Sequence, residues 1–190
     1  MYLKLKFLLL VCLFFLSACT SFVVPDVDLT EENYPTKFKI SEDEIYTKKM
    51  RTSVEDMNFI VIVNQSSELS GMRKKTDEFM TVSLDKMGFK KVLSENEFLQ
   101  LIYKQGLHKN VIDIYSHKSL ARIYEKTGSF LLLVAEFGSE GHGKVKIKIF
   151  DPEIDEPVFK LNTSAFVFSY DEQVLYPTVN AINDWYKASQ

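Results

Sequence analysis

The sequence predicts an α/β fold of the mixed α+β kind, with one mixed β-sheet of about five strands and helices packed on it. Three observations lead to this prediction. A continuous apolar run at 59–63 is followed by a helical pattern and a second extended run, which is the order of a β-α-β crossover. Three extended runs between 130 and 168 have the pattern of a meander. An amphipathic C-terminal helix follows them.

The crossover accounts for the first part of this pattern. The run at 59–63 is apolar throughout, which predicts a central strand covered on both faces. Apolar residues then recur at helical spacing from Leu69 to Met87, with Ser67 as the expected cap and Gly88 as the expected end. A second strand is expected at Phe89–Leu93, so the connection is a right-handed parallel crossover.

Two shorter helices are expected next. Ser94 followed by Glu97 is the pattern of a capping box, in which each side chain accepts a hydrogen bond from the other residue's backbone amide. A second helix is expected from about Ser116 to Thr127, ended by Gly128. The three strands of the meander are then expected at 130–137, 144–150 and 158–168.

The last helix is expected within 171–188. Leu175, Val179 and Ile182 recur at helical spacing and would form its apolar face. Pro177 lies inside this pattern. Proline is tolerated in the first turn of a helix, where its missing N–H would have had no partner. We therefore expect the helix to begin near Tyr176 rather than to be kinked at Pro177.

The chain before the first strand is expected to be irregular. Pro25 and Pro35 interrupt any regular helix, and only one short helix, capped by Ser41, is expected there. We therefore divide the mature chain at residue 57. Residues 19–56 are predicted to be a lipidated tether, near the cysteine, followed by an irregular N-terminal segment, and residues 57–190 are predicted to be a single globular α/β domain.

Residues 1–18 have the pattern of a cleaved signal peptide. Lys4 and Lys6 give it a positively charged start, and the apolar stretch Phe7–Leu16 is shorter than the roughly 20 residues that a membrane-spanning helix needs. The run Leu16-Ser17-Ala18-Cys19 then places two small residues and a cysteine behind a leucine. This run resembles the lipobox of bacterial lipoproteins.

The resemblance implies that Cys19 is the lipid attachment residue. In that family the cysteine thiol is joined to diacylglycerol, the chain is cut just before it, and the new amino terminus is acylated. The alternative is an ordinary signal peptide or an uncleaved anchor, with Cys19 incidental. Thr20 stands where the inner-membrane retention signal of enterobacterial lipoproteins has an aspartate. The resemblance therefore favours the outer membrane, on its periplasmic face.

The charge and the cysteine content exclude two classes of function. The net charge of the full chain is −3, and removal of the two lysines at positions 4 and 6 makes it about −5, which argues against a nucleic-acid partner. Cys12 lies in the signal peptide and Cys19 would carry lipid. The folded domain would then have no thiol, which excludes thiol chemistry and cysteine metal sites.

The order of elements also resembles a known α/β domain. It is similar to the domain of TolB amino-terminal regions, of CsgG-type lipoproteins and of LpoB-type peptidoglycan-synthase activators. The likeness lies in the run Phe59–Val63, the helix after it and the pair Gly88-Phe89. It implies a fold but transfers no site residue.

Two loops contain residues that could bind ions. The three glycines of Gly138–Gly143 lie between two expected strands, so a hairpin loop is favoured over a phosphate-binding loop. Asp151, Glu153 and Asp155 alternate like the first ligands of a calcium loop. Glu156 stands where such a loop requires glycine. We therefore interpret this stretch as a solvated acidic turn.

The histidines do not form a metal-binding pattern. His108 and His117 lie nine positions apart, whereas metal-binding pairs on one element lie three to five apart. His142 lies alone in the glycine-rich loop. No nucleophile motif is present either. We therefore predict no catalytic residue, no metal site and no cofactor.

Lys144, Lys146 and Lys148 are expected to lie on one face of a strand because they alternate with apolar residues. They have two interpretations. They could form a surface for an anionic partner. They could also be solubilising cover, or protect a sheet edge against strand addition.

These observations predict a lipid-anchored lipoprotein that acts as a non-catalytic binding or scaffold module in envelope assembly or maintenance. Its partner would be another envelope protein or peptidoglycan. One alternative is an envelope hydrolase or small-ligand binder whose site is assembled from distant residues. Another is a subunit of a secretion apparatus that oligomerises through a sheet edge.

Overall fold

The computed structural model describes residues 22–66, 72–109, 113–138, 143–164 and 169–190. The predicted signal peptide and Cys19 lie outside these residues, as do Ser67, Leu69 and His142. Lipid attachment at Cys19 therefore stays a prediction. In the described part of the chain, no helix is both long and apolar enough to cross a membrane.

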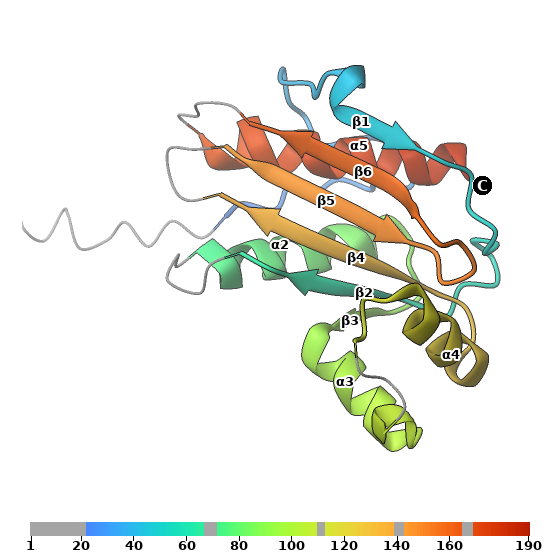
Figure 1. The fold of residues 1–190 in the computed structure, drawn as a ribbon. Coiled ribbons are helices and arrows are strands. Elements are labelled where there is room, and N and C mark those ends of the chain that lie inside the picture. Colours follow the sequence, from blue (N-terminus) through green and yellow to red (C-terminus); the bar gives the residue numbers. More distant parts are fainter. Residues whose placement is uncertain (1–21, 67–71, 110–112, 139–142, 165–168) are drawn as a thin grey trace, which may run out of the picture.

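One six-stranded mixed sheet forms the centre of the fold, with the strand order β1-β6-β5-β4-β2-β3 (Figure 1). Its strand β2 pairs in parallel with β3 on one side and with β4 on the other, while the remaining pairs are antiparallel. The sequence prediction of a mixed sheet with a crossover and a meander is confirmed. The strands are β1 (Ile45–Thr47), β2 (Phe59–Asn64), β3 (Val92–Ser94), β4 (Phe130–Phe137), β5 (Val145–Phe150) and β6 (Pro157–Thr163).

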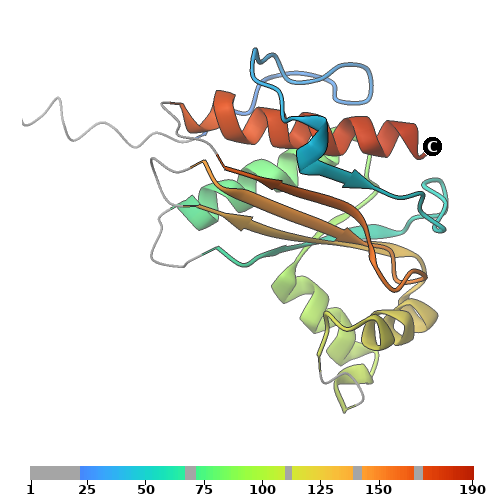
Figure 2. The same cartoon turned by 45° about the horizontal axis from the view of Figure 1, so that its top comes forward.

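Helices cover the two faces of the sheet unequally (Figures 1 and 2). On one face, α2 (Met72–Lys86) and α5 (Tyr176–Ala188) pack over most of its width. On the other face, α3 (Glu95–Lys104) and α4 (His117–Thr127) pack on β2, β3 and β4. Among the described residues, no helix lies over β1, β6 and β5 on that second face.

The strand β2 is buried along its whole length because it lies under helices on both faces. Ile60 and Ile62 point into the cluster under α2 and α5, whereas Phe59, Val61 and Val63 point into the cluster under α3 and α4. This confirms the central strand that the continuous apolar run predicts.

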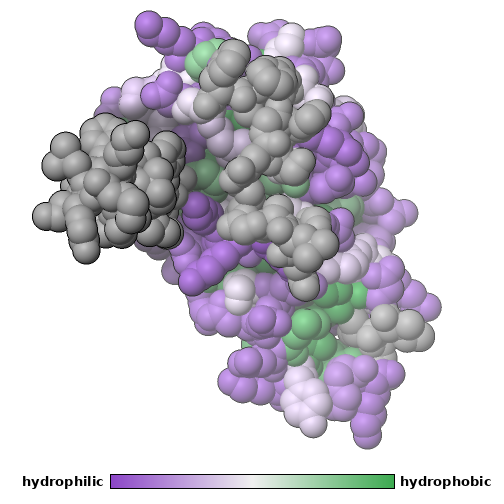
Figure 3. All heavy atoms as spheres, turned by 90° about the vertical axis from the view of Figure 1, so that its left-hand side faces the viewer, coloured by the Kyte–Doolittle hydropathy of each residue, from purple (hydrophilic) through white to green (hydrophobic). Residues whose placement is uncertain are grey.

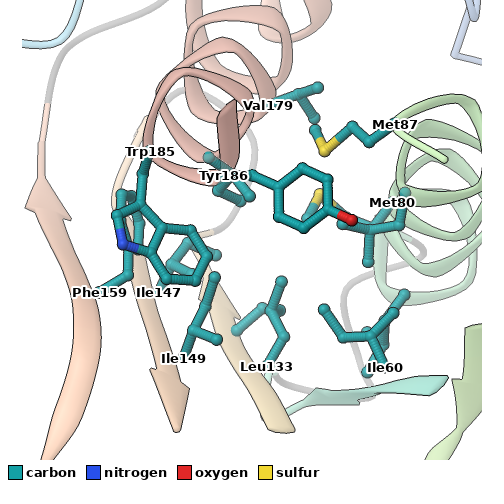
Figure 4. Packing of buried hydrophobic residues seen from close by; sticks show 14 of the residues in the cluster. Ile60, Met80, Met87, Leu133, Ile147, Ile149, Phe159, Val179, Trp185 and Tyr186 are labelled. Atoms are coloured by element: carbon teal, nitrogen blue, oxygen red, sulfur yellow. The ribbon is translucent and has the colours of Figure 1, made fainter. Parts of the chain in front are cut away.

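The larger cluster joins α5 to the sheet (Figure 4). Trp185 packs against Phe159 of β6, with the ring centroids 5.4 Å apart. Tyr186 stacks on Phe89, which follows α2, at 4.4 Å. Met80 of α2 lies in the same cluster. These aromatic contacts fix the position of the last helix over the sheet.

The predicted helix ends are found where the sequence places them. The Glu97 carboxylate accepts a hydrogen bond of 2.8 Å from the Ser94 amide, and the Ser94 hydroxyl accepts one from the Glu97 amide. Gly128, which ends α4, has a φ of 83°, and a Cβ there would collide with the Asn58 side chain. The helix α5 begins at Tyr176 with Pro177 in its first turn, after a π-helical turn, η3 (Asp171–Leu175).

The N-terminal segment differs from the prediction. A short 3-10 helix, η1 (Glu42–Glu44), leads directly into β1, which pairs with β6 and gives the sheet a sixth strand. Leu29, Tyr34 and Met50 are buried in the larger cluster. The predicted tether of residues 19–56 is thus part of the folded unit from at least Leu29 onward, and the predicted boundary at residue 57 does not match this packing.

The crossover also ends later than expected. The second strand was expected at Phe89–Leu93, but the pairing with β2 begins at Val92. Phe89 instead turns into the core against Tyr186, because the aromatic contact places it under α5 rather than in the sheet. The apolar character of Phe89 therefore reflects burial and not strand pairing.

Candidate binding surface

The topology brings two strand ends together at a switch point. The connection from β2 to β3 runs through α2 on one face, and the connection from β3 to β4 runs through α3 and α4 on the other. The carboxyl ends of β2 and β4 therefore lie side by side between helices on opposite faces. Open α/β sheets bind their ligands in the crevice at such a point.

The residues that end β2 tie it to its neighbours. The Asn64 amide donates to the Thr76 hydroxyl at 3.0 Å and to the Asp77 carboxylate at 2.8 Å, both on α2. The hydroxyl of Ser66 accepts from the Phe137 amide of β4 at 2.7 Å. Burial raises the pKa of Asp77, and the hydrogen bond from Asn64 opposes this shift. These groups stabilise the strand ends, and their polar atoms are hydrogen-bonded to one another.

Tyr115 lies at the edge of this region, in the loop before α4. Its hydroxyl donates to the Glu95 carboxylate at 2.8 Å, and the Arg73 guanidinium lies 3.9 Å from the same carboxylate. Burial, and then the hydrogen bond to Glu95, raises the pKa of Tyr115 to about 12. Tyr115 therefore remains a neutral hydrogen-bond donor at any physiological pH.

A groove of about 280 Å³ runs from Tyr115 onto the sheet. Val134 and Phe150 form its apolar part, and they come from the adjacent strands β4 and β5. Its polar lining consists of Gln65, Tyr115, Glu136, Lys146 and Lys148. A surface of this kind combines apolar contact with a few charged groups, as binding sites commonly do.

The groove opens onto the uncovered half of the sheet, which we call the open sheet face. It consists of the outward residues of β1, β6, β5 and β4, together with Lys144. Period-two alternation places these residues on the same side as Val134 and Glu136. They are Tyr46, Val134, Glu136, Lys144, Lys146, Lys148, Phe150, Lys160 and Asn162.

Four lysines and one carboxylate give the open sheet face a positive charge. Glu136 is paired with Lys146 at 2.9 Å and with Lys144 at 3.5 Å. The hydrogen bond from Lys146 holds the pKa of Glu136 below its usual range. Lys148 and Lys160 form no ion pair within the part of the chain that the structure describes, and Lys160 lies over the Tyr46 ring at 4.7 Å.

Figure 3 views the molecule from the end to which β2 and β4 point. An apolar area, in green, lies in the lower part of this view, at the level of α3 and α4 in Figure 1, and hydrophilic residues surround it. Apolar and charged surface are therefore found together at the carboxyl end of the parallel strands.

The structure excludes one of the interpretations given above for Lys144, Lys146 and Lys148. Lys146 and Lys148 lie on one face of β5, as predicted. Lys144 and Lys146 both form an ion pair with Glu136. The strand β5 pairs on both sides, with β4 and β6. Protection of a sheet edge is therefore wrong as an interpretation. A surface for an anionic partner and a solubilising cover both remain.

The acidic turn is not solvated throughout, which corrects the interpretation of Asp151. Asp151 is fully buried, and its carboxylate accepts from the amides of Arg51 and Thr52 at 2.8 and 2.9 Å and from the Thr52 hydroxyl at 2.9 Å. Glu153 and Asp155 are exposed, as expected. Asp151 thus holds the segment after β1 in place and is not available as a ligand.

His108 and His117 are separated in the structure. His108 stacks on Tyr103, with the ring centroids 4.6 Å apart, whereas His117 begins α4 and its Nδ1 is buried. Within the described ranges, no group of three histidine, cysteine or acidic residues lies close enough to hold a metal ion.

Sequence reasoning missed Gln65, Tyr115 and Phe150. No local motif marks these residues, and they come together only through the pairing of β4 with β5 and the packing of α4. The rule on strand carboxyl ends could have pointed to Gln65, which follows β2 directly.

Comparison with known proteins shows no family. No family model and no curated protein sequence matches this chain. Among solved structures, the C-terminal domain of LpoB from Salmonella enterica overlaps with a TM-score of 0.39 and 10% identity, covering 59% of this chain and 84% of that domain. A PelC dodecamer from Paraburkholderia phytofirmans overlaps with a TM-score of 0.41 and 8% identity, covering 77% of this chain and 97% of that one.

Proposed function

We propose that this protein is a non-catalytic binding module of the bacterial cell envelope, held at a membrane by a lipid on Cys19. In this proposal the open sheet face receives an anionic partner. The observation that carries the proposal is the cluster of Lys144, Lys146, Lys148 and Lys160 on a part of the sheet that no helix of the described chain covers.

The charge of this face stands out against the rest of the protein. The whole chain has 26 acidic and 23 basic residues, yet the open sheet face has four lysines and only one acidic side chain. A surface whose sign is opposite to that of the whole protein guides a partner of the other sign to one orientation. An acidic envelope protein or peptidoglycan, which carries carboxylates, would fit this surface.

The lipid anchor limits where the partner can be. Acyl chains contribute roughly 0.8 kcal/mol per buried CH₂, so the two or three chains of a lipoprotein hold the domain firmly at a bilayer. With Cys19 acylated and Leu29 already in the folded unit, a short segment would separate the domain from the membrane. The protein would then bind its partner close to the periplasmic face of the outer membrane.

Three further observations bear on the alternatives. The groove of about 280 Å³ is smaller than most sites that enclose a small ligand, which favours contact with a larger surface. The edge strands β1 and β3 have three residues each, which is too short for oligomerisation by strand addition. The paired Glu136 is also a poor general acid, because Lys146 lowers its pKa.

Crosslinking in native envelopes tests the proposal. A photo-crosslinking residue at position 162, in place of the exposed Asn162, is expected to capture a partner, and Lys146→Glu together with Lys148→Glu is expected to abolish the capture. The control is Lys37→Glu with Lys39→Glu, which makes the same charge change on the segment that packs on α5. This control variant is expected to capture the partner as the natural protein does. Equal loss in both double variants, or no capture from position 162, would contradict the proposal.

A further inference from the structure

A second hollow lies at the other end of the parallel strands. It has a volume of about 740 Å³ and is enclosed by the segment 49–57, by the turn from Met87 to Lys90 and by the end of α5. Phe59, the first residue of β2, also lines it, so it is separated from the groove by the length of the strand. We call this hollow the basal cavity.

Basic residues dominate the lining of the basal cavity. Lys49, Arg51, Lys90 and Lys187 contribute positive side chains, and Glu55 contributes the one acidic side chain. None of these four basic residues forms an ion pair with a described residue; Lys90 donates instead to the backbone oxygen of Glu55 at 2.6 Å. Several unpaired like charges around one hollow create a positive potential that favours an anion.

A buried acceptor lies on the same cavity. Asn183 is fully buried, and its amide nitrogen donates to the Leu29 oxygen at 2.9 Å and to the Asn33 Oδ1 at 2.8 Å. Its own Oδ1 accepts no hydrogen bond from the described residues, and Asn183 is part of the cavity lining. A buried acceptor without a donor is unfavourable, so a ligand with an O–H or N–H group would gain by reaching it.

The remaining lining is partly polar, from threonine, serine and glutamine residues, and partly apolar, and the apolar part suits a small organic molecule. Met57, Met87 and Tyr186 are largely buried and face the cavity from three different segments. Lys49, Arg51 and Lys90 are exposed. The cavity therefore has exposed positive groups, buried apolar side chains and one buried acceptor. Its volume lies in the range of sites that enclose small ligands.

We propose that the basal cavity binds a small hydroxylated anion, namely a sugar that carries a carboxylate or a phosphate. The basic residues bind the anionic group, and Asn183 Oδ1 accepts from a hydroxyl. The apolar side chains contact the C–H face of the ring. This site is separate from the open sheet face and does not depend on the function proposed for it.

Calorimetric titration of the full-length protein in detergent tests this assignment with four probes. Glucuronate and glucose 6-phosphate distinguish a carboxylate from a phosphate. Glucose has the hydroxyls without the charge, and cyclohexanecarboxylate has the charge without the hydroxyls. We expect at least one of the two sugar anions to bind and both control probes to bind about tenfold more weakly or not at all.

A matched pair of variants locates the binding. The double variant Arg51→Gln with Lys187→Gln is expected to lower the affinity for the sugar anion about tenfold. The hydrogen bond from Arg51 to Asp151 comes from the backbone amide, so the fold is retained. Lys118→Gln with Lys126→Gln removes two exposed lysines of α4 and is expected to leave affinity unchanged. The assignment is overturned if neither sugar anion binds, if glucose binds equally, or if both double variants behave alike.

Discussion

Lys148 of β5 lies directly opposite Lys160 of β6 on the open sheet face. Two like charges directly opposite each other in a cross-strand pair destabilise a sheet. The sheet has this unfavourable pair on its uncovered half, where a bound anion would relieve it. The arrangement is therefore the local feature that best separates a binding surface from a merely solubilising one.

Lys148→Glu tests this pair. We expect the free energy of unfolding to rise by about 0.2–1 kcal/mol, because opposite charges then face each other. Capture of the partner from the open sheet face should fall at the same time. Chemical denaturation at low salt measures the first effect. The double variant Lys148→Glu with Lys160→Glu restores like charges, so a double variant as stable as the single one would contradict this account.

Leu29→Ala tests whether the N-terminal segment belongs to the folded unit. Leu29 is fully buried in the larger cluster, so its truncation is expected to lower the free energy of unfolding by about 2–5 kcal/mol. Val23, which is 64% exposed, serves as the control, and Val23→Ala should change stability by less than about 0.5 kcal/mol. If residues 19–56 were a free tether, the two variants would be equally stable in urea denaturation.

Ionisation of the Tyr115 hydroxyl is expected to make the free energy of unfolding depend on pH in the alkaline range. The pKa of Tyr115 is about 12 in the folded protein, above the usual value of 10 that the unfolded chain would have. The folded state thus keeps a proton that the unfolded state loses. The stabilisation is complete below pH 10 and is lost as the pH rises from 10 to 12, by on the order of 1–2 kcal/mol.

Comparing denaturation at pH 9 and pH 11.5 measures this loss. Tyr115→Phe is expected to be less stable by about 1 kcal/mol at pH 9, because the hydrogen bond to Glu95 is missing, and to lose less stability at high pH. Tyr103→Phe changes a tyrosine that is 67% exposed and should keep the pH dependence of the natural protein. An unchanged pH dependence in Tyr115→Phe would refute the assignment.

Cys19→Ala tests the anchor. Labelled palmitate is expected to mark the natural protein and Cys12→Ala, but not Cys19→Ala, which should no longer reach the outer membrane. Label on Cys19→Ala, or its retention in the outer membrane, would show that the lipobox resemblance is misleading.

The sequence alone determined the features that depend on neighbouring residues. The continuous run of β2 marks a strand buried on both faces, and Ser94 with Glu97 marks the start of α3. Gly128 ends α4, and Pro177 lies in the first turn of α5. In each case the cause lies within a few residues, in backbone hydrogen bonding or side-chain periodicity.

Tertiary structure decided what depends on residues far apart in the chain. The strand β1 has only three residues, too few for a periodic pattern, and it forms because β6 provides a partner more than a hundred positions later. Pairing and helix coverage likewise place Lys148 opposite Lys160 and leave both uncovered. Asn183 donates a hydrogen bond to the Leu29 oxygen and lines the basal cavity only when α5 is packed on the sheet. Local sequence patterns cannot determine these contacts, because strand register and layer packing are set by the whole fold.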